Sequence, residues 1–154
     1  MNWLDFWNGN HSIYVCDRHK IRHHEKIGED IIRRLDGKPG LVVDYGCGEA
    51  LSAPEVAKHC KRLIVSDAAP SVRQGLIERF QDNPSIDVLS PDEVMALTPG
   101  SIDVVIINSV LQYLAPEETE ALLSRLAPLL ADKGRIILGD IIPPDHTVFA
   151  DAGA

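Results

Sequence analysis

The 154-residue sequence has little of what stabilises a disulfide-linked or zinc-bound protein. It contains three cysteines, Cys16, Cys47 and Cys60, and no two of them form a C-x-x-C pair. An odd number of cysteines without paired spacing predicts neither a disulfide framework nor a structural zinc site. The sequence therefore favours a protein of the reducing cytoplasm.

The sequence also lacks an excess of basic residues and long apolar runs. Lys and Arg number 15 against 23 Asp and Glu, and the formal net charge of -8 repels nucleic acid and anionic membranes at long range. No apolar run is long enough to span a membrane, and the N-terminal residues lack the basic and apolar regions of a signal peptide. We expect neither nucleic acid nor a membrane as a partner.

What is present is the composition of one globular domain. Hydrophobic residues make up 45% of the chain and charged residues 25%, and no internal repeat interrupts it. We expect residues 1–40 to form an N-terminal helical or lid segment, with a helix capped by Asp17 and ending near Leu35. Residues 41–154 should form the main domain.

Short apolar runs alternate with helical stretches after residue 40. The runs are rich in β-branched residues, which is typical of strands buried on both faces of a parallel sheet. They occupy residues 41–43, 63–65, 86–89, 104–107 and 136–138. The alternation predicts an α/β fold with a doubly wound, mainly parallel sheet of about five strands. In such sheets, ligands bind at the carboxyl ends of the strands, where the strand order reverses.

Helix start signals lie between these runs. Ser52, Ser71 and Ser90 are each followed three residues later by Glu or Gln, which is the pattern of a capping box. Pro91 and Pro116 stand where the first turn of a helix tolerates proline. We therefore expect helices to begin close to these residues.

A glycine-containing turn follows the first expected strand. Gly46 and Gly48 flank Cys47, and glycines at this spacing let a tight turn approach a ligand without obstruction by side chains. Asp67 ends the second strand 19 residues after Gly48, close to the offset at which an acid reaches ribose hydroxyls in this architecture. These residues indicate a ligand that contains adenosine.

Two residues depart from the dinucleotide-binding pattern. Leu51 stands in place of the third glycine, and Glu49 puts an anion near the helix N-terminus that a pyrophosphate would occupy. An acid at this position instead favours the cationic end of a ligand with a sulfonium group and an amino-acid tail. The charge argument favours S-adenosylmethionine over NAD.

Several blocks of the sequence resemble class I S-adenosylmethionine-dependent methyltransferases, particularly the bacterial small-molecule type. Residues 42–50 look like the glycine-rich first motif of that family, and residues 63–71 are similar to its second-strand motif. Residues 100–105 with 108–114 look like its fourth strand and cofactor-facing loop, and residues 134–138 like its fifth strand. The resemblance implies a Rossmann-like fold and S-adenosylmethionine as cofactor, with S-adenosylhomocysteine as product. The implied cofactor-binding residues are Asp44, Gly46, Cys47, Gly48, Glu49, Asp67, Ala68, Ser90, Asn108, Ser109 and Val110.

The sequence departs from that family's pattern at three places. Ala50 stands where another glycine is common, and the acid-containing motif near the third strand is reduced to residues 90–93. The family also continues past its fifth strand through a helix and an antiparallel strand pair. The resemblance therefore implies that the Rossmann-like domain of residues 41–154 is incomplete at its C-terminal end.

The candidate site residues also have structural interpretations. Asp44 is equally well explained as an anchor of the glycine turn through backbone hydrogen bonds. Asp67 has the alternative role of a helix cap, and Glu49 that of an acid which stabilises a helix dipole. Nothing near Cys47 marks it as a nucleophile.

Histidines and aromatic residues near the N-terminus offer further candidates. His19, His23 and His24 lack the accompanying acid or cysteine pattern of a metal site, so the sequence predicts no metal. Four aromatic residues before residue 15 form either a lid over the ligand or a packing surface at the sheet edge. They are Trp3, Phe6, Trp7 and Tyr14.

The implied reaction is an in-line displacement at a methyl group, for which positioning and exclusion of water supply much of the acceleration. A hydroxyl or ammonium acceptor needs a base, and the candidates from loop placement are Tyr14, His19 and Asp140. We expect a small-molecule methyl acceptor, whose identity the sequence does not give, and no particular oligomeric state. The alternatives are a non-catalytic S-adenosylmethionine-binding or interaction domain and, disfavoured by the charge argument, a nicotinamide-dependent oxidoreductase.

Overall fold

The computed structural model describes residues 16–141. Their strands are β1 (Leu41–Tyr45), β2 (Arg62–Ser66), β3 (Ile86–Leu89), β4 (Ile102–Asn108) and β5 (Leu130–Gly139). The strands form one sheet in the order β3-β2-β1-β4-β5, and every neighbouring pair is parallel. The predicted doubly wound sheet is confirmed, and each expected apolar run lies in a strand.

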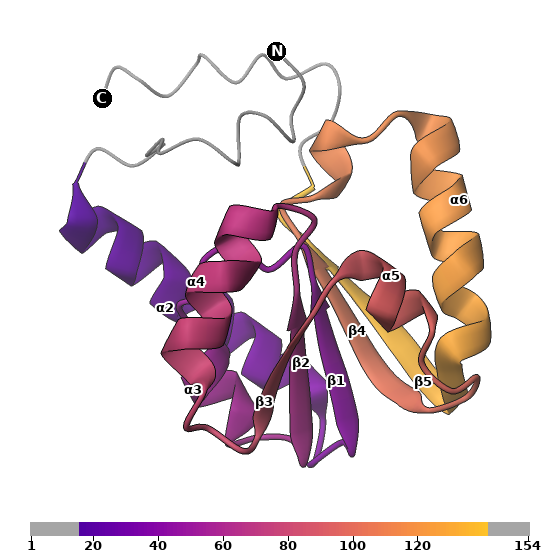
Figure 1. Ribbon diagram of the computed structural model, residues 1–154, viewed down its shortest axis with the longest axis horizontal. Helices are drawn as coiled ribbons and strands as arrows, with labels where there is room; N and C mark the ends of the chain where they lie inside the picture. The colour runs from indigo at the N-terminus through magenta and orange to yellow at the C-terminus, as the bar shows by residue number, and fades with distance from the viewer. Residues whose placement is uncertain (1–15, 142–154) are drawn as a thin grey trace.

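Helices cover both faces of this sheet (Figure 1). On one face lie α2 (Asp17–Leu35), α3 (Ala53–Ala57) and α4 (Pro70–Phe80), and on the other lie α5 (Pro91–Met95) and α6 (Pro116–Leu126). Two short 3₁₀ helices, η1 (Leu111–Tyr113) and η2 (Ala127–Leu129), flank α6. Within residues 16–141, no helix combines the length and apolarity that crossing a membrane requires.

The strands separate two hydrophobic cores because successive side chains of a strand point to opposite faces. Val42 of β1 and Leu63 of β2 pack on the face of α2, α3 and α4, together with Ile31 of α2. Val43 and Ile64, the next residue along each strand, pack on the face of α5 and α6. Burial on both faces explains why the strands read as nearly continuous apolar runs.

Helix α2 is held against the sheet layer at two places. A Cβ atom on Gly28 would lie 2.8 Å from Cβ of Ser52, so glycine allows α2 to approach the start of α3 closely. At the end of α2, Nη2 of Arg135 in β5 donates hydrogen bonds to the carbonyl oxygens of Arg34, at 2.8 Å, and Leu35. These contacts fix the direction of α2 relative to the carboxyl ends of the strands.

The predicted helix starts are partly confirmed. Ser90 and Glu93 form the expected capping box, and α5 and α6 begin at Pro91 and Pro116. Ser52 precedes α3, but its side chain makes no capping hydrogen bond. The predicted cap at Asp17 is wrong, because Asp17 is the first helical residue of α2 and Cys16 occupies the cap position.

The predicted cap at Ser71 is wrong. Helix α4 begins one residue earlier, at Pro70, and its cap is Ala69. Proline disfavours a helical conformation for the residue before it and is itself suited to the first helical position. The boundary therefore falls between Ala69 and Pro70.

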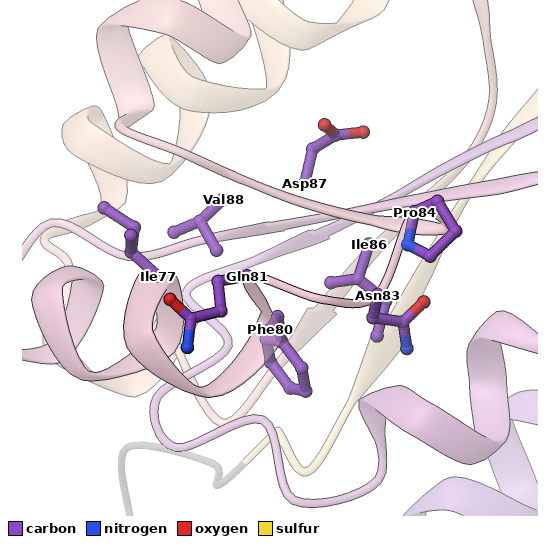
Figure 2. Close-up of a pocket in the computed structure, with 8 residues that line it drawn as sticks. All are labelled: Ile77, Phe80, Gln81, Asn83, Pro84, Ile86, Asp87 and Val88. Carbon is purple, nitrogen blue, oxygen red and sulfur yellow. The ribbon is translucent and has the colours of Figure 1, made fainter.

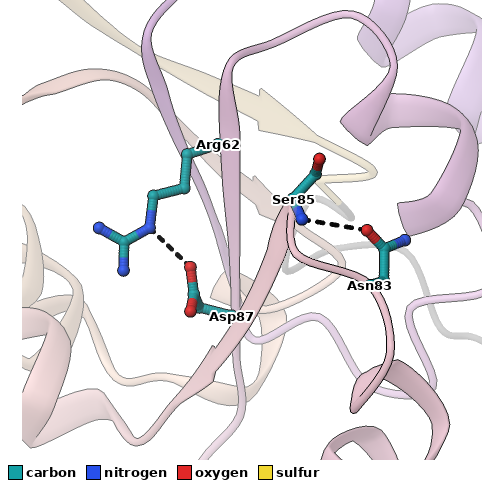
Figure 3. Close-up of polar contacts among 4 residues, drawn as sticks. All are labelled: Arg62, Asn83, Ser85 and Asp87. Carbon is teal, nitrogen blue, oxygen red and sulfur yellow. Dashed lines mark hydrogen bonds and ion pairs between the residues drawn. The ribbon is translucent and has the colours of Figure 1, made fainter.

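The β2–β3 edge of the sheet is supported by polar contacts (Figure 3). Nε of Arg62 lies 2.6 Å from Oδ2 of Asp87, which joins the two strands. In the turn before β3, the backbone N–H of Ser85 donates to Oδ1 of Asn83 at 3.1 Å. These contacts hold β3 in register without involving the carboxyl ends of the strands.

Candidate functional site

The carboxyl ends of β1 and β4 mark the place where the strand order reverses. From β1 the chain proceeds through β2 to β3 on one side, and then returns to β4 on the other side of β1. Ligands of doubly wound sheets bind in the crevice at this point. The predicted residues after β1, β2, β3 and β4 all lie at this end of the sheet.

The turn after β1 is fixed by backbone hydrogen bonds to β2. The N–H groups of Gly46 and Cys47 donate to the carbonyl oxygen of Ser66 at 2.7 and 2.9 Å. Gly46 has φ of 74° and Gly48 has φ of 55°, and both angles lie in the left-handed region that favours glycine. A Cβ on Gly46 would overlap the side chain of Val110, whereas a Cβ on Gly48 would meet no atom within 4 Å. Gly46 therefore permits close packing on the β4 loop, and Gly48 borders open space.

Asp67 braces the same turn from the end of β2. Its Oδ2 accepts a hydrogen bond from the N–H of Gly48 at 3.0 Å, and its Oδ1 accepts one from the N–H of Ala69 at 2.9 Å. Arg73 donates to the carbonyl oxygens of Asp67 and Ala68 at 2.7 and 2.8 Å. Both carboxylate oxygens keep capacity for a further hydrogen bond. A contact between Asp67 and ribose stays a prediction.

Asp44 lies beneath the turn, where its negative charge is unfavourable. Burial, and secondly repulsion by Asp67, raise the pKa of Asp44 to about 7. Burial and the two carboxylates also raise the pKa of the Cys47 thiol well above its usual range. Cys47 is therefore a protonated thiol near neutral pH, in agreement with its predicted lack of a nucleophilic role.

Glu49 projects from the turn toward α2 and forms an ion pair with Lys20. His24 lies one helical turn beyond Lys20, and burial, followed by repulsion from His23, lowers its pKa. His19, which the sequence offered as a candidate base, is exposed.

One face of α2 leads from the core to the glycine turn. It is formed by residues 20, 24, 28, 31 and 35, which recur at helical spacing, so the face that is buried at the C-terminal end of α2 continues toward the turn. That periodicity was the available signal for Lys20.

The loop after β4 carries a polar cluster formed by Asn108, Ser109 and Asp140. Asn108 pairs with Gly139 across β4 and β5, and a Cβ on Gly139 would overlap Oδ1 of Asn108. Nδ2 of Asn108 donates to Oγ of Ser109 at 3.1 Å, and Oγ of Ser109 donates to Oδ2 of Asp140. Three predicted site residues therefore meet, although 31 positions separate Ser109 from Asp140.

Ser90 and Ser66, at the same end of the sheet, differ in how their hydroxyl groups are paired. The N–H of Ser90 donates to Oε2 of Glu93 at 2.7 Å, and Oγ of Ser90 accepts from the N–H of Glu93 at 3.3 Å, so Ser90 caps α5. Ser66 is fully buried, and its Oγ lacks a hydrogen-bond partner among the described residues. A buried hydroxyl without a partner carries a free-energy cost, which a ligand donor or acceptor would remove.

Some of the predicted site residues lie outside residues 16–141. Tyr14 and the other aromatic residues of the N-terminal segment lie outside the described residues, as does the C-terminal part of the main domain. Within residues 16–141, no group of three or more His, Cys, Asp or Glu side chains is arranged to hold a metal ion.

A pocket of about 280 Å³ lies away from the candidate site, between the end of α4 and β3 (Figure 2). Its lining includes Phe80, Pro84 and Ile86, which belong to the end of α4, the following turn and the first residue of β3. Ile86 pairs with Leu63 near the start of β2, so this part of the pocket lies near the amino ends of the strands. The sequence did not predict it, and it contains none of the predicted site residues.

Comparisons with known proteins agree with this architecture. A family model described as a methyltransferase domain matches residues 43–138. A carboxy-S-adenosyl-L-methionine synthase from Pseudomonas fluorescens (strain SBW25) is 30% identical over 124 residues, which cover 70% of this chain and 50% of that protein.

Solved structures share the fold. Phosphoethanolamine N-methyltransferase 1 from Haemonchus contortus has a TM-score of 0.71 at 20% identity, over 88% of this chain and 30% of that one. The N-methyltransferase NodS from Bradyrhizobium japonicum WM9 has a TM-score of 0.69 at 19% identity, over 88% of this chain and 70% of that one. The present chain spans about half the length of the curated relatives that it matches, 50% and 44%.

Proposed function

Because the chain belongs to the methyltransferase-domain family of class I S-adenosylmethionine-dependent enzymes, we propose that it binds S-adenosylmethionine and transfers the methyl group to a small molecule. The observation that carries the proposal is the braced glycine turn. Ser66 and Asp67 fix the turn from β2, and Val110 packs against it from the β4 loop. The turn thus stands at the switch point with open space beside Gly48.

The residues at this turn fit a cationic nucleoside ligand. Asp67 and the Lys20-paired Glu49 supply carboxylates beside the turn, and Asp44 is a further acid that ionises only above about pH 7. These acids suit a sulfonium and an ammonium group and disfavour a pyrophosphate. The unpartnered Oγ of Ser66 adds a buried polar group at the end of β2. Asp67 is proposed to bind the ribose hydroxyls through its remaining lone pairs, and the Asn108–Val110 loop to cover the other side.

When bound, S-adenosylmethionine supplies an electrophilic methyl group on a positively charged sulfur. The residues of the chain then have to hold the ligand, orient an acceptor and exclude water. Two of the structural neighbours are named as N-methyltransferases, one of them for phosphoethanolamine, which supports a small-molecule acceptor. The cysteine pattern supports a cytoplasmic location.

The test is calorimetry of the 154-residue chain with S-adenosylmethionine, S-adenosylhomocysteine and NAD. We expect the first two to bind and NAD not to bind. Asp67→Ala should weaken the binding of S-adenosylhomocysteine by about 1–3 kcal/mol, because the ribose hydroxyls and the N–H of Gly48 lose a charged acceptor. Asp82→Ala, at an exposed acid after α4, is the matched control.

The outcomes separate the candidate functions. Failure of the folded chain to bind either adenosine ligand would overturn the proposal. Binding without methyl transfer to any acceptor, in this chain and in any longer product of the same gene, would favour the non-catalytic binding domain. An unchanged dissociation constant for Asp67→Ala would remove Asp67 from the site.

A further inference from the structure

The hydrogen bonds of the polar cluster all point toward Asp140. Asn108 donates to Ser109, and Ser109 donates to Oδ2 of Asp140, so each group uses a donor to support the next. Within residues 16–141, we find a hydrogen bond to Oδ2 of Asp140 and none to Oδ1. The cluster therefore presents an oriented carboxylate with acceptor capacity to spare.

The backbone that presents this cluster is held in an unusual conformation. Ser109 has φ of 56° and Asp140 has φ of 51°, which are left-handed values at two residues that are not glycine. Such conformations cost about 1 kcal/mol or more each and persist where the surrounding structure fixes them. Here the N–H of Ser109 donates to the carbonyl oxygen of Gly139 at 3.1 Å, which joins the ends of β4 and β5. The two left-handed residues turn both side chains toward each other.

The cluster lies beside the proposed cofactor site. Ser109 directly precedes Val110, and Val110 is the residue whose side chain packs on Gly46 of the glycine turn. The β1–β4 pairing brings Asp44 opposite Ile106, two residues before Asn108. A group held by Asp140 would thus stand at the same end of the sheet as the ligand, on the β5 side of the switch point.

The charge of the cluster selects the kind of group that it binds. Asp140 is exposed, and none of the ion pairs formed within residues 16–141 includes it. A carboxylate that accepts hydrogen bonds and has no cationic partner there is suited to a protonated amine, which supplies both charge and donors. A hydroxyl supplies a donor without charge, and a carboxylate or phosphate is repelled.

We propose that Asp140 binds the amino group of a cationic methyl acceptor beside the cofactor, and that Ser109 positions its carboxylate. This assignment rests on the proposed function, because it places an acceptor next to the S-adenosylmethionine site. It narrows the acceptor from small molecules in general to amines.

The test uses analogues of S-adenosylhomocysteine in which nitrogen replaces sulfur and carries a third arm in place of the methyl group. The arm ends in a primary amine, a hydroxyl or a methyl group, and each is made with two and with four carbons. Calorimetry on the full chain compares wild type with Asp140→Asn, Ser109→Ala and Asp132→Asn. Asp132→Asn is the matched control, because Asp132 is an exposed acid near the start of β5, the strand that Asp140 directly follows.

We expect wild type to bind the amine-ended analogue about tenfold more tightly than the methyl-ended one, as for a charge-assisted hydrogen bond. That ratio should fall to about one in Asp140→Asn, fall partly in Ser109→Ala, and persist in Asp132→Asn. The methyl-ended analogue reports in each variant whether the cofactor site survives.

Each contrary result has a separate meaning. If neither S-adenosylhomocysteine nor any analogue binds wild type, the proposed function itself fails. If S-adenosylhomocysteine binds but no armed analogue does, or the preference for the amine is absent or survives in Asp140→Asn, the acceptor assignment is wrong. Loss of S-adenosylhomocysteine binding in Asp140→Asn would also overturn it, because Asp140 would then serve the cofactor site or the fold.

Discussion

At the scale of single residues, burial of Asp44 makes the stability of the folded state depend on pH. Its pKa is raised from 3.8 to about 7 by burial and by Asp67. Between these two values the folded state holds a proton that the unfolded state has released, so the free energy of unfolding falls as the pH rises. The unfavourable contribution is absent below about pH 4 and complete above about pH 7.

Asp44→Asn should therefore stabilise the protein more at high pH than at low pH. From the raised pKa, we expect the stability difference between variant and wild type to increase by about 2–3 kcal/mol from pH 5 to pH 8. Urea unfolding at both pH values measures this difference. Asp82→Asn, at the exposed acid, should follow the wild-type profile. Equal differences at pH 5 and pH 8 would show that Asp44 is not held in its protonated form.

For single residues, the sequence predicted the position of those that directly follow a strand. It missed features that depend on how other elements pack against this end of the sheet. Asp67 and Asn108 could be placed at one end of the sheet because the carboxyl ends of parallel strands converge, and their contact with a ligand stays a prediction. Lys20 was missed because its role depends on how closely α2 approaches α3, and this distance depends on Gly28. Ser66 was missed because a buried unpartnered hydroxyl is a property of the packed state.

At the scale of elements, the two glycines of the turn between β1 and α3 have different structural roles. Both Gly46 and Gly48 have positive φ, but only a Cβ on Gly46 meets another side chain, that of Val110. The left-handed backbone costs a non-glycine residue about 1–2 kcal/mol, and overlap with a β-branched side chain adds about 1–3 kcal/mol.

Gly46→Ala should therefore lower the free energy of unfolding by about 2–5 kcal/mol, and Gly48→Ala by about 1–2 kcal/mol. Both variants should also weaken the binding of S-adenosylhomocysteine, Gly46→Ala because it displaces the β4 loop and Gly48→Ala because its Cβ enters the open space proposed for the ligand. Denaturant unfolding and calorimetry on the same preparations measure both effects. Similar losses of unfolding free energy in the two variants would mean that the Val110 side chain moves aside at no cost in free energy.

Element types were predictable from the sequence, and element boundaries less so. The β-branched runs identified every strand within residues 16–141, because burial on both faces leaves no room for polar alternation. The capping box at Ser90 was found because its pattern is local, whereas the same pattern at Ser71 was overridden by Pro70. The left-handed conformations of Ser109 and Asp140 have no sequence signal, because they arise where two distant strands end together.

For the whole molecule, the two edges of the sheet differ in length and character. At one edge β3 has four residues, whereas at the other β5 has ten and pairs only with β4 among the described residues. Leu138, near the end of β5, is 42% exposed. A long edge with an exposed apolar side chain offers unpaired backbone groups to another strand.

We therefore expect the 154-residue chain to self-associate at high concentration, and Leu138→Lys to reduce this association. A lysine on an edge strand disfavours pairing with the edge strand of another molecule, because its charged side chain would have to lie close to the partner chain. Sedimentation velocity over a range of concentrations measures the effect, with Ile77→Lys, at an exposed apolar residue of α4, as control. A monomeric wild type, or equal behaviour of both variants, would exclude β5 as the associating edge.

The hydrogen bonds from Arg135 to the end of α2 also bear on how the chain folds as it is synthesised. Arg135 and Leu35 are separated by 100 positions, and the helix leaves the ribosome long before the strand that secures its end. At about 5–20 residues per second, roughly 5–20 s pass between the two events. During that interval the C-terminal carbonyl groups of α2 lack the hydrogen bonds from Arg135, so the docking of α2 is completed only after β5 has been made.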